Sequence, residues 1–214
     1  MPAPDRMSSA ASVAPSAAAP VPAVPSARQL APLRFTNVNT RQSASLGLYD
    51  RKDRVDEAAA TRLDLLLGDA RRPGHYEVHR IDRRLLQLVY RAAYHFSASE
   101  VRVISAYRRP GRRREGLHAL GRAIDFKLLG VPAATLASYL RHQPRVGVGV
   151  YTHPRTQFVH LDVRDRSFHW LDASPPHKRW REKSLHTSHL PELDATYRRE
   201  LDWPEGVAMP ASSG

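Results

Sequence analysis

The sequence predicts an α+β fold in one small domain, because helical patterns come early in the chain and most strand patterns come late. Helical spacing of apolar residues is strongest over 55–67 and 82–92, whereas 146–151 and 157–163 alternate as strands do. No strand–helix–strand repeat is visible. A chain of 214 residues with 42% hydrophobic and 25% charged residues suffices for one buried core.

The first elements follow from short apolar patterns. Residues 33–40 predict a strand, and 45–49 form a second short apolar segment after a polar turn. Leucines at helical spacing over 55–67 predict a helix that ends at Gly68. Asp82 has the side chain to cap the start of a second, strongly apolar helix.

Strand patterns dominate the rest of the domain. Residues 101–104 predict a strand, and a helix is expected over 133–141. The runs 146–151 and 157–163 are expected to be neighbouring strands.

The two ends of the chain differ from this domain in composition. Residues 1–32 hold seven of the 17 prolines among Ala and Ser, a composition that predicts a disordered leader. Residues 177–214 form a polar, basic extension that is expected to pack loosely. The folded domain is therefore expected to span 33–176.

Charge and cysteine usage exclude some classes of function. Lys and Arg number 33 against 21 Asp and Glu, and the net charge of +12 favours polyanionic partners such as nucleic acid, anionic lipid or an acidic wall polymer. The absence of cysteine excludes disulfides, thiolate zinc sites and a cysteine nucleophile. No run reaches the roughly 18 apolar residues of a membrane-spanning helix. No Leu-rich run behind a basic segment marks a signal peptide.

The segment around 117–125 carries the first candidate site. His118 and Asp125 are separated by six residues, among which Gly121 and Ala123 are small enough to let the backbone bring both side chains to one centre. On a strand, the Ile124 side chain would face the core, and the Asp125 side chain would point to the opposite face. Catalytic zinc usually takes three protein ligands, so a third is needed.

The strand over 157–163 supplies that third candidate. His160 and Asp162 share one face of it, while Val159 and Leu161 occupy the other. Two imidazoles and a carboxylate suit Zn²⁺, although the residue types leave other divalent metals open.

Four motifs in this order resemble a known family: Ser105-x-Tyr107-Arg108, His118-x-x-Gly121-x-Ala123-x-Asp125, Gly147-x-Gly149-x-Tyr151 and Phe158-Val159-His160-x-Asp162. Together they resemble the MepK (YcbK-like) murein endopeptidases, within the wider group of D-Ala-D-Ala carboxypeptidase-like zinc peptidases. The resemblance covers about 33–170.

The resemblance implies a small α+β domain whose central antiparallel sheet carries Zn²⁺ on His118, Asp125 and His160, with helices packed around it. It also implies that zinc-activated water attacks a peptide carbonyl, with Arg108 helping to stabilise the oxyanion. Relatives in the wider group place Glu three residues before the last histidine, where this chain has Gln157. Asp162 is the replacement candidate for the general base, or else an acceptor that orients a ligand imidazole.

Peptidoglycan is the expected partner. Arg108 and Tyr151 are candidates for binding substrate, and the arginines at 108, 109 and 112–114 would attract acidic stem peptides. No nucleic-acid-binding motif accompanies this patch, so nucleic acid is not the expected partner.

Two hypotheses of function follow. One is a metallopeptidase that cuts cross-links or stem peptides in the periplasm or elsewhere in the cell envelope. The alternative is a non-catalytic, zinc-containing module that binds the wall, which Gln157 keeps open. The sequence leaves open whether a D,D or an L,D bond is cut, the export route and the oligomeric state.

Overall fold

The structure is a computed structural model that describes residues 30–69, 78–110, 116–176, 178, 182–185 and 187–203. The expected leader, except for its last three residues, lies outside the described residues. So do the arginines at 112–114.

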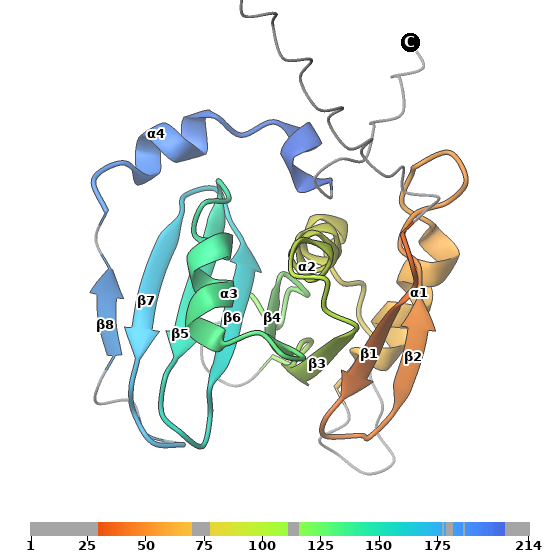
Figure 1. Cartoon of the computed structure of the whole chain (residues 1–214), viewed down its shortest axis with the longest axis horizontal. Coiled ribbons are helices and arrows are strands. Elements are labelled where there is room, and N and C mark those ends of the chain that lie inside the picture. Colours follow the sequence, from red (N-terminus) through yellow and green to blue (C-terminus); the bar gives the residue numbers. More distant parts are fainter. Residues whose placement is uncertain are drawn as a thin grey trace, which may run out of the picture.

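One eight-stranded sheet organises the described chain (Figure 1). Its order is β2-β1-β3-β4-β6-β5-β7-β8. The strands are β1 (Leu33–Asn37), β2 (Ser43–Leu46), β3 (Glu100–Ser105), β4 (Ala123–Leu128), β5 (Val146–Tyr151), β6 (Phe158–Val163), β7 (Phe168–Asp172) and β8 (Glu182–Leu185).

The α+β class is confirmed, but the sheet is mixed and not purely antiparallel as expected. β1 pairs with β3 in parallel, and β5 pairs with β7 in parallel. The second parallel pair arises because β4 and β5 occupy both edges of β6. β7 reverses direction after β6 and joins the free edge of β5, so it runs parallel to β5.

Two helices cover one face of the central strands. The α-helices are α1 (Glu57–Leu66), α2 (Arg83–His95), α3 (Ala133–Leu140) and α4 (Leu190–Ala195), and η2 (Arg199–Asp202) is a short 3₁₀ turn. Asp82 caps α2 as predicted, accepting a hydrogen bond from the Arg84 amide at 2.9 Å. α2 and α3 pack on the central strands β4, β5 and β6. No described helix has the length and apolar character that crossing a membrane requires.

Strand alternation separates a core face from an open face on the central strands. The side chains toward α2 and α3, including Ile124, Phe126, Val148 and Leu161, are fully buried. The residues between them in sequence project from the opposite face, and these include Asp125 and Gly149. The apolar register thereby determines which side chains are available for chemistry.

Parts of the segment beyond Pro176 pack against the domain, contrary to expectation. β8 extends the sheet beside β7. The Asp194 carboxylate accepts hydrogen bonds from the backbone amides of Arg145 at 2.6 Å and Ser167 at 2.7 Å. Trp203 is buried, and its indole N–H donates to the Asp53 carbonyl at 3.1 Å. In Figure 1 this segment runs back from β8 toward α2.

Candidate metal centre

Asp125 and His160 lie directly opposite each other in the antiparallel β4–β6 pair. Both project from the open face, because Ile124 and Leu161 beside them point into the core. Each side chain is nevertheless largely buried, with side-chain exposures of 8% for Asp125 and 11% for His160. The sheet therefore holds a carboxylate and an imidazole in a partly dehydrated position.

A tight turn before β4 brings His118 to the same place. Gly121 has a φ of 66°, and a Cβ there would overlap the carbonyl oxygen of Arg80. Only glycine fits such a left-handed, crowded position without strain. The turn is closed by hydrogen bonds from the Gly121 amide to the His118 carbonyl and from the Arg122 amide to the Leu117 carbonyl.

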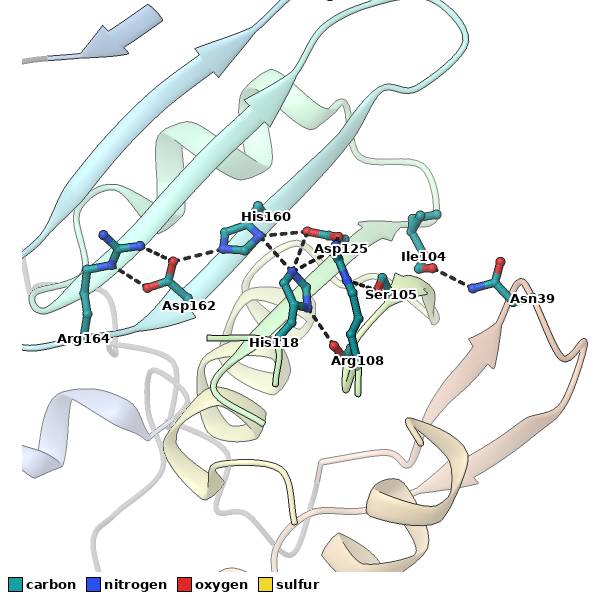
Figure 2. A network of polar contacts seen from close by, with 10 residues as sticks. Asn39, Ile104, Ser105, Arg108, His118, Asp125, His160, Asp162 and Arg164 are labelled. Atoms are coloured by element: carbon teal, nitrogen blue, oxygen red, sulfur yellow. Dashed lines mark hydrogen bonds and ion pairs between the residues drawn. The ribbon is translucent and has the colours of Figure 1, made fainter. Parts of the chain in front are cut away.

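The hydrogen bonds of the two histidines determine which ring nitrogens face inward (Figure 2). His118 Nδ1 lies 2.6 Å from the Ala106 carbonyl oxygen, an acceptor, so Nδ1 carries the proton. His160 Nε2 lies 3.0 Å from Asp162 Oδ2 and donates to it. His118 Nε2 and His160 Nδ1 are thus left as the inward-facing atoms, and their separation is 3.3 Å.

These atoms converge on one oxygen of Asp125. Asp125 Oδ1 is 2.8 Å from His160 Nδ1 and 3.5 Å from His118 Nε2. All three atoms lie within 4.8 Å of one another. A tetrahedral zinc ion with bonds of about 2.0–2.1 Å places its ligand atoms about 3.3 Å apart. The donor set and its spacing therefore fit a divalent metal.

Arg108 adds a positive charge beside the same atoms. Its Nη2 lies 2.8 Å from His118 Nε2 and also contacts Asp125 Oδ2. Its Nε donates to Ser105 Oγ at 2.7 Å, and Ser105 pairs with Asp125 across the β3–β4 ladder. The guanidinium is thereby held at the edge of the candidate site, with its side chain 38% exposed.

The pKa values in this cluster reflect the same contacts. Burial raises the pKa of Asp125, but its close polar contacts with His118 and His160 outweigh burial and hold that pKa well below its usual range. Burial lowers the pKa of His160, but hydrogen bonds to Asp125 and Asp162 outweigh it and raise that pKa. The cluster is therefore built to hold a negative carboxylate against a positive charge.

Asp162 lies on the far side of the His160 ring from Asp125. It is fully buried and accepts from His160 Nε2, while Arg164 Nε donates to its Oδ1 at 2.5 Å and Arg164 Nη2 contacts its Oδ2. Burial raises its pKa, but the hydrogen bonds from Arg164 and His160 lower it overall. Gly147 lies beneath this pair, since a Cβ there would overlap Asp162 and Arg164.

An aromatic side chain supports His160 from the other direction. The Trp170 ring lies 5.0 Å from the His160 ring, measured between centroids. It rests on the backbone of Gly149, where a Cβ would overlap the indole. Phe168, which is 39% exposed, stacks on Trp170 at 5.8 Å. The two glycines of β5 thus allow close approach of side chains that surround the site.

Tyr151 lies on the same face of the sheet as the candidate metal ligands, two residues along the strand from the position that pairs with His160. It pairs with Phe158 across β5 and β6, and their rings stack with centroids 4.2 Å apart. Gln157 lies just before β6 with a φ of 41°. Neither Tyr151 nor Gln157 belongs to the group of three inward-facing atoms.

Three contributors to the site escaped the sequence predictions: the Ala106 carbonyl, Arg164 and Trp170. Arg164 continues the two-residue alternation from His160 through Asp162, so that spacing could have indicated it. Trp170 comes from a strand that was not predicted, and the Ala106 carbonyl is a backbone group that carries no sequence signal.

Comparison with known proteins shows the family to which the chain belongs. The family model described as peptidoglycan L,D-endopeptidase MepK matches residues 25–170. A protein of Haemophilus influenzae, described as a probable peptidoglycan L,D-endopeptidase MepK, is 31% identical over 144 residues, which cover 61% of this chain and 74% of the relative. No solved structure matches the chain. The chain belongs to the peptidoglycan L,D-endopeptidase MepK family.

Proposed function

We propose that this chain is a zinc-dependent endopeptidase that hydrolyses peptide cross-links or stem peptides of bacterial peptidoglycan. The observation that carries the proposal is the convergence of His118 Nε2 and His160 Nδ1 on Asp125, with ligand spacing that fits a tetrahedral ion. The family and the Haemophilus relative are described as L,D-endopeptidases, so an L,D bond is the expected target. This activity would place the protein in the cell envelope.

His118, Asp125 and His160 would hold the metal. A bound Zn²⁺ supplies Lewis acidity that activates water and polarises the peptide carbonyl. The protein contributes fixed ligands: the Ala106 carbonyl holds His118 by its Nδ1, and Asp162 holds His160 by its Nε2. Partners of this kind orient ligand imidazoles and raise their basicity.

Arg108 is the proposed stabiliser of negative charge on the carbonyl oxygen. Its guanidinium is anchored through Ser105 Oγ and remains 38% exposed, so it can reach substrate from the edge of the site. A preorganised cation of this kind acts most strongly when charge develops in the transition state. Tyr151 lies on the same face of the sheet, beyond His160, and is proposed to contact another part of the substrate.

Asp162 is better suited to orienting His160 than to serving as the general base. The His160 ring separates it from Asp125, both of its oxygens accept hydrogen bonds, and it has no exposed surface. A general base must come within hydrogen-bond reach of the proton it removes, directly or through one water. We therefore assign Asp162 as a positioning residue and leave the base unassigned.

The second candidate function is a module that binds the cell wall and keeps the metal group, His118, Asp125 and His160, but does not cleave peptides. Gln157 favours it, because an amide cannot accept the proton that a glutamate at that position would take.

The test is a muropeptide profile of purified sacculi incubated with zinc-loaded protein, with His118→Ala as the control. We expect loss of cross-linked species with the wild type alone, and the products identify the bond that is cut. An unchanged profile from protein that holds zinc and binds sacculi would instead support the wall-binding module.

A further inference from the structure

A second row of side chains lies beside the candidate metal ligands on the open face. Lys127 follows Asp125 by two residues on β4, and Phe158 precedes His160 by two on β6. Tyr151 pairs with Phe158 on β5. Two residues along a strand span about 6.6 Å. An extended substrate peptide would therefore span the distance from the metal group to this row with about two residues.

Phe158 and Tyr151 give this row an apolar surface. Their rings are nearly parallel, with 18° between planes and 4.2 Å between centroids. Both side chains are partly exposed, so the stack presents one edge or face to solvent. Such a surface suits the aliphatic part of an amino-acid residue better than a charged group.

Lys127 gives the same row a positive charge. It is partly exposed, and its side chain makes no ion pair with any residue that the structure describes. Its neighbour across the β3–β4 ladder is Arg102, another cation, which is occupied by a contact of 3.3 Å from its Nε to Glu100 Oε1. A cation beside a like charge and an aromatic stack attracts an anionic partner.

Among the residues that the structure describes, Arg108 also brings a positive charge to the candidate metal ligands, and we have assigned it to the carbonyl oxygen of the scissile bond. Arg108 contacts His118, Asp125 and Ser105, as described above. A carboxylate on the substrate at the Phe158 side therefore finds its charge partner in Lys127.

We propose that Lys127, Phe158 and Tyr151 form a subsite for a substrate residue that carries a free carboxylate near the scissile bond. The ammonium of Lys127 binds the carboxylate, and the aromatic stack supports the adjoining aliphatic chain. This assignment rests on the proposed peptidase function and adds to it a determinant of substrate choice.

The experiment compares two cross-linked peptides that differ only in the carboxylate nearest the scissile bond, free in one and amidated in the other. Metal-loaded wild type, Lys127→Met and Arg102→Met are assayed on both. We expect the wild type to prefer the free acid by about tenfold in kcat/KM, as a hydrogen bond between charged groups allows. Lys127→Met should lose that preference through KM, whereas the matched control Arg102→Met should retain it.

A Phe158→Leu variant tests the aromatic part of the subsite. It keeps an apolar side chain but removes the stack with Tyr151, so it should lower kcat/KM for both peptides to a similar extent. Circular dichroism and zinc content establish that each variant is folded and loaded.

Equal use of both peptides by the wild type, or a preference that survives in Lys127→Met, would overturn the subsite. Wild type that holds zinc but cleaves neither peptide contradicts the peptidase function instead. Calorimetric binding of the two peptides then decides the subsite independently of turnover: stronger binding of the free acid that depends on Lys127 supports it, and equal binding overturns it.

Discussion

Replacing Asp162 with asparagine separates a positioning role from a general-base role. The carboxylate accepts a hydrogen bond from His160 Nε2 at 3.0 Å and neutralises Arg164, and it has no exposed surface. Asparagine keeps the shape but removes the negative charge. His160 would then lose the negatively charged acceptor that increases its basicity as a ligand, since an amide oxygen is a weaker acceptor, while no group on the inward side of its ring would change.

The expected magnitude follows from these contacts. Loss of a partner that orients a metal ligand typically lowers metal affinity about 10–100-fold, or roughly 1.4–2.8 kcal/mol. Breaking a buried ion pair costs about 3–5 kcal/mol of folding stability when the remaining charge is fully buried. The Arg164 side chain is 26% exposed, so the loss of stability should be smaller. The double variant with Arg164→Gln removes the leftover charge and should recover part of it.

Two measurements distinguish the roles: zinc affinity by competition with a chelator, and kcat on a cross-linked peptide at saturating zinc. A positioning role predicts weakened zinc binding with kcat within about tenfold of the wild type once zinc saturates the protein. A general-base role predicts unchanged affinity and a loss of about 10²–10⁴ in kcat. The second pattern would refute our assignment of Asp162.

Two further predictions concern packing and pH. Gly149→Ala should lower stability by about 1–3 kcal/mol and weaken zinc binding, because its methyl group would displace Trp170 from His160; urea unfolding and chelator competition check this, and two unchanged values would contradict it. Burial raises the pKa of Asp194, but hydrogen bonds from Ser167 outweigh it and lower that pKa overall. Its stabilising contribution is therefore present above the unfolded pKa of about 3.9 and is lost as pH falls through the folded pKa. The stability deficit of Asp194→Asn in urea unfolding should be constant near pH 7 and shrink below about pH 4; a deficit independent of pH would show that the charge is not involved.

Most of the fold could be predicted because its central elements carry strong local signals. The Asp82 cap and the apolar periodicity of α2 placed that helix, and the alternation over β5 and β6 placed two neighbouring strands. β7, β8 and α4 were not predicted. β7 breaks the alternation with Phe168, His169 and Trp170 in succession, and β8 is a short, polar edge strand. Its stability comes from pairing with β7 and not from its own sequence.

The parallel pairings could not be read from the sequence for a different reason. Local patterns specify strands but not which edges remain free for later strands. β7 joins β5 only because β4 already occupies the other edge of β6. The loose packing expected beyond Pro176 was wrong on similar grounds, since Asp194 and Trp203 are anchored by distant backbone groups of Ser167 and Asp53.

The candidate site was predictable as far as the strand alternation extends. That alternation placed Asp125 on the polar face of one strand, and His160 with Asp162 on the polar face of a second strand. The resemblance then grouped Asp125 and His160 with His118. The alternation could not show that Asp162 lies behind His160 and not beside the metal group, because both positions share the same face. The distinction depends on which imidazole nitrogen faces Asp125, and only the geometry gives that.

The position of the metal group is ultimately a consequence of burial. Asp125 faces His160 because Ile124 pairs with Leu161 and Phe126 with Val159, and all four apolar side chains are fully buried beneath α2 and α3. A slip of one residue between β4 and β6 would turn His160 and Asp162 into the core and bring Leu161 to the open face. The desolvation of two polar groups and the exposure of apolar ones make that slip costly. The hydrophobic core therefore holds Asp125 and His160 in register, and the crowded turn at Gly121 has only to bring His118 to a pair that the sheet has already aligned.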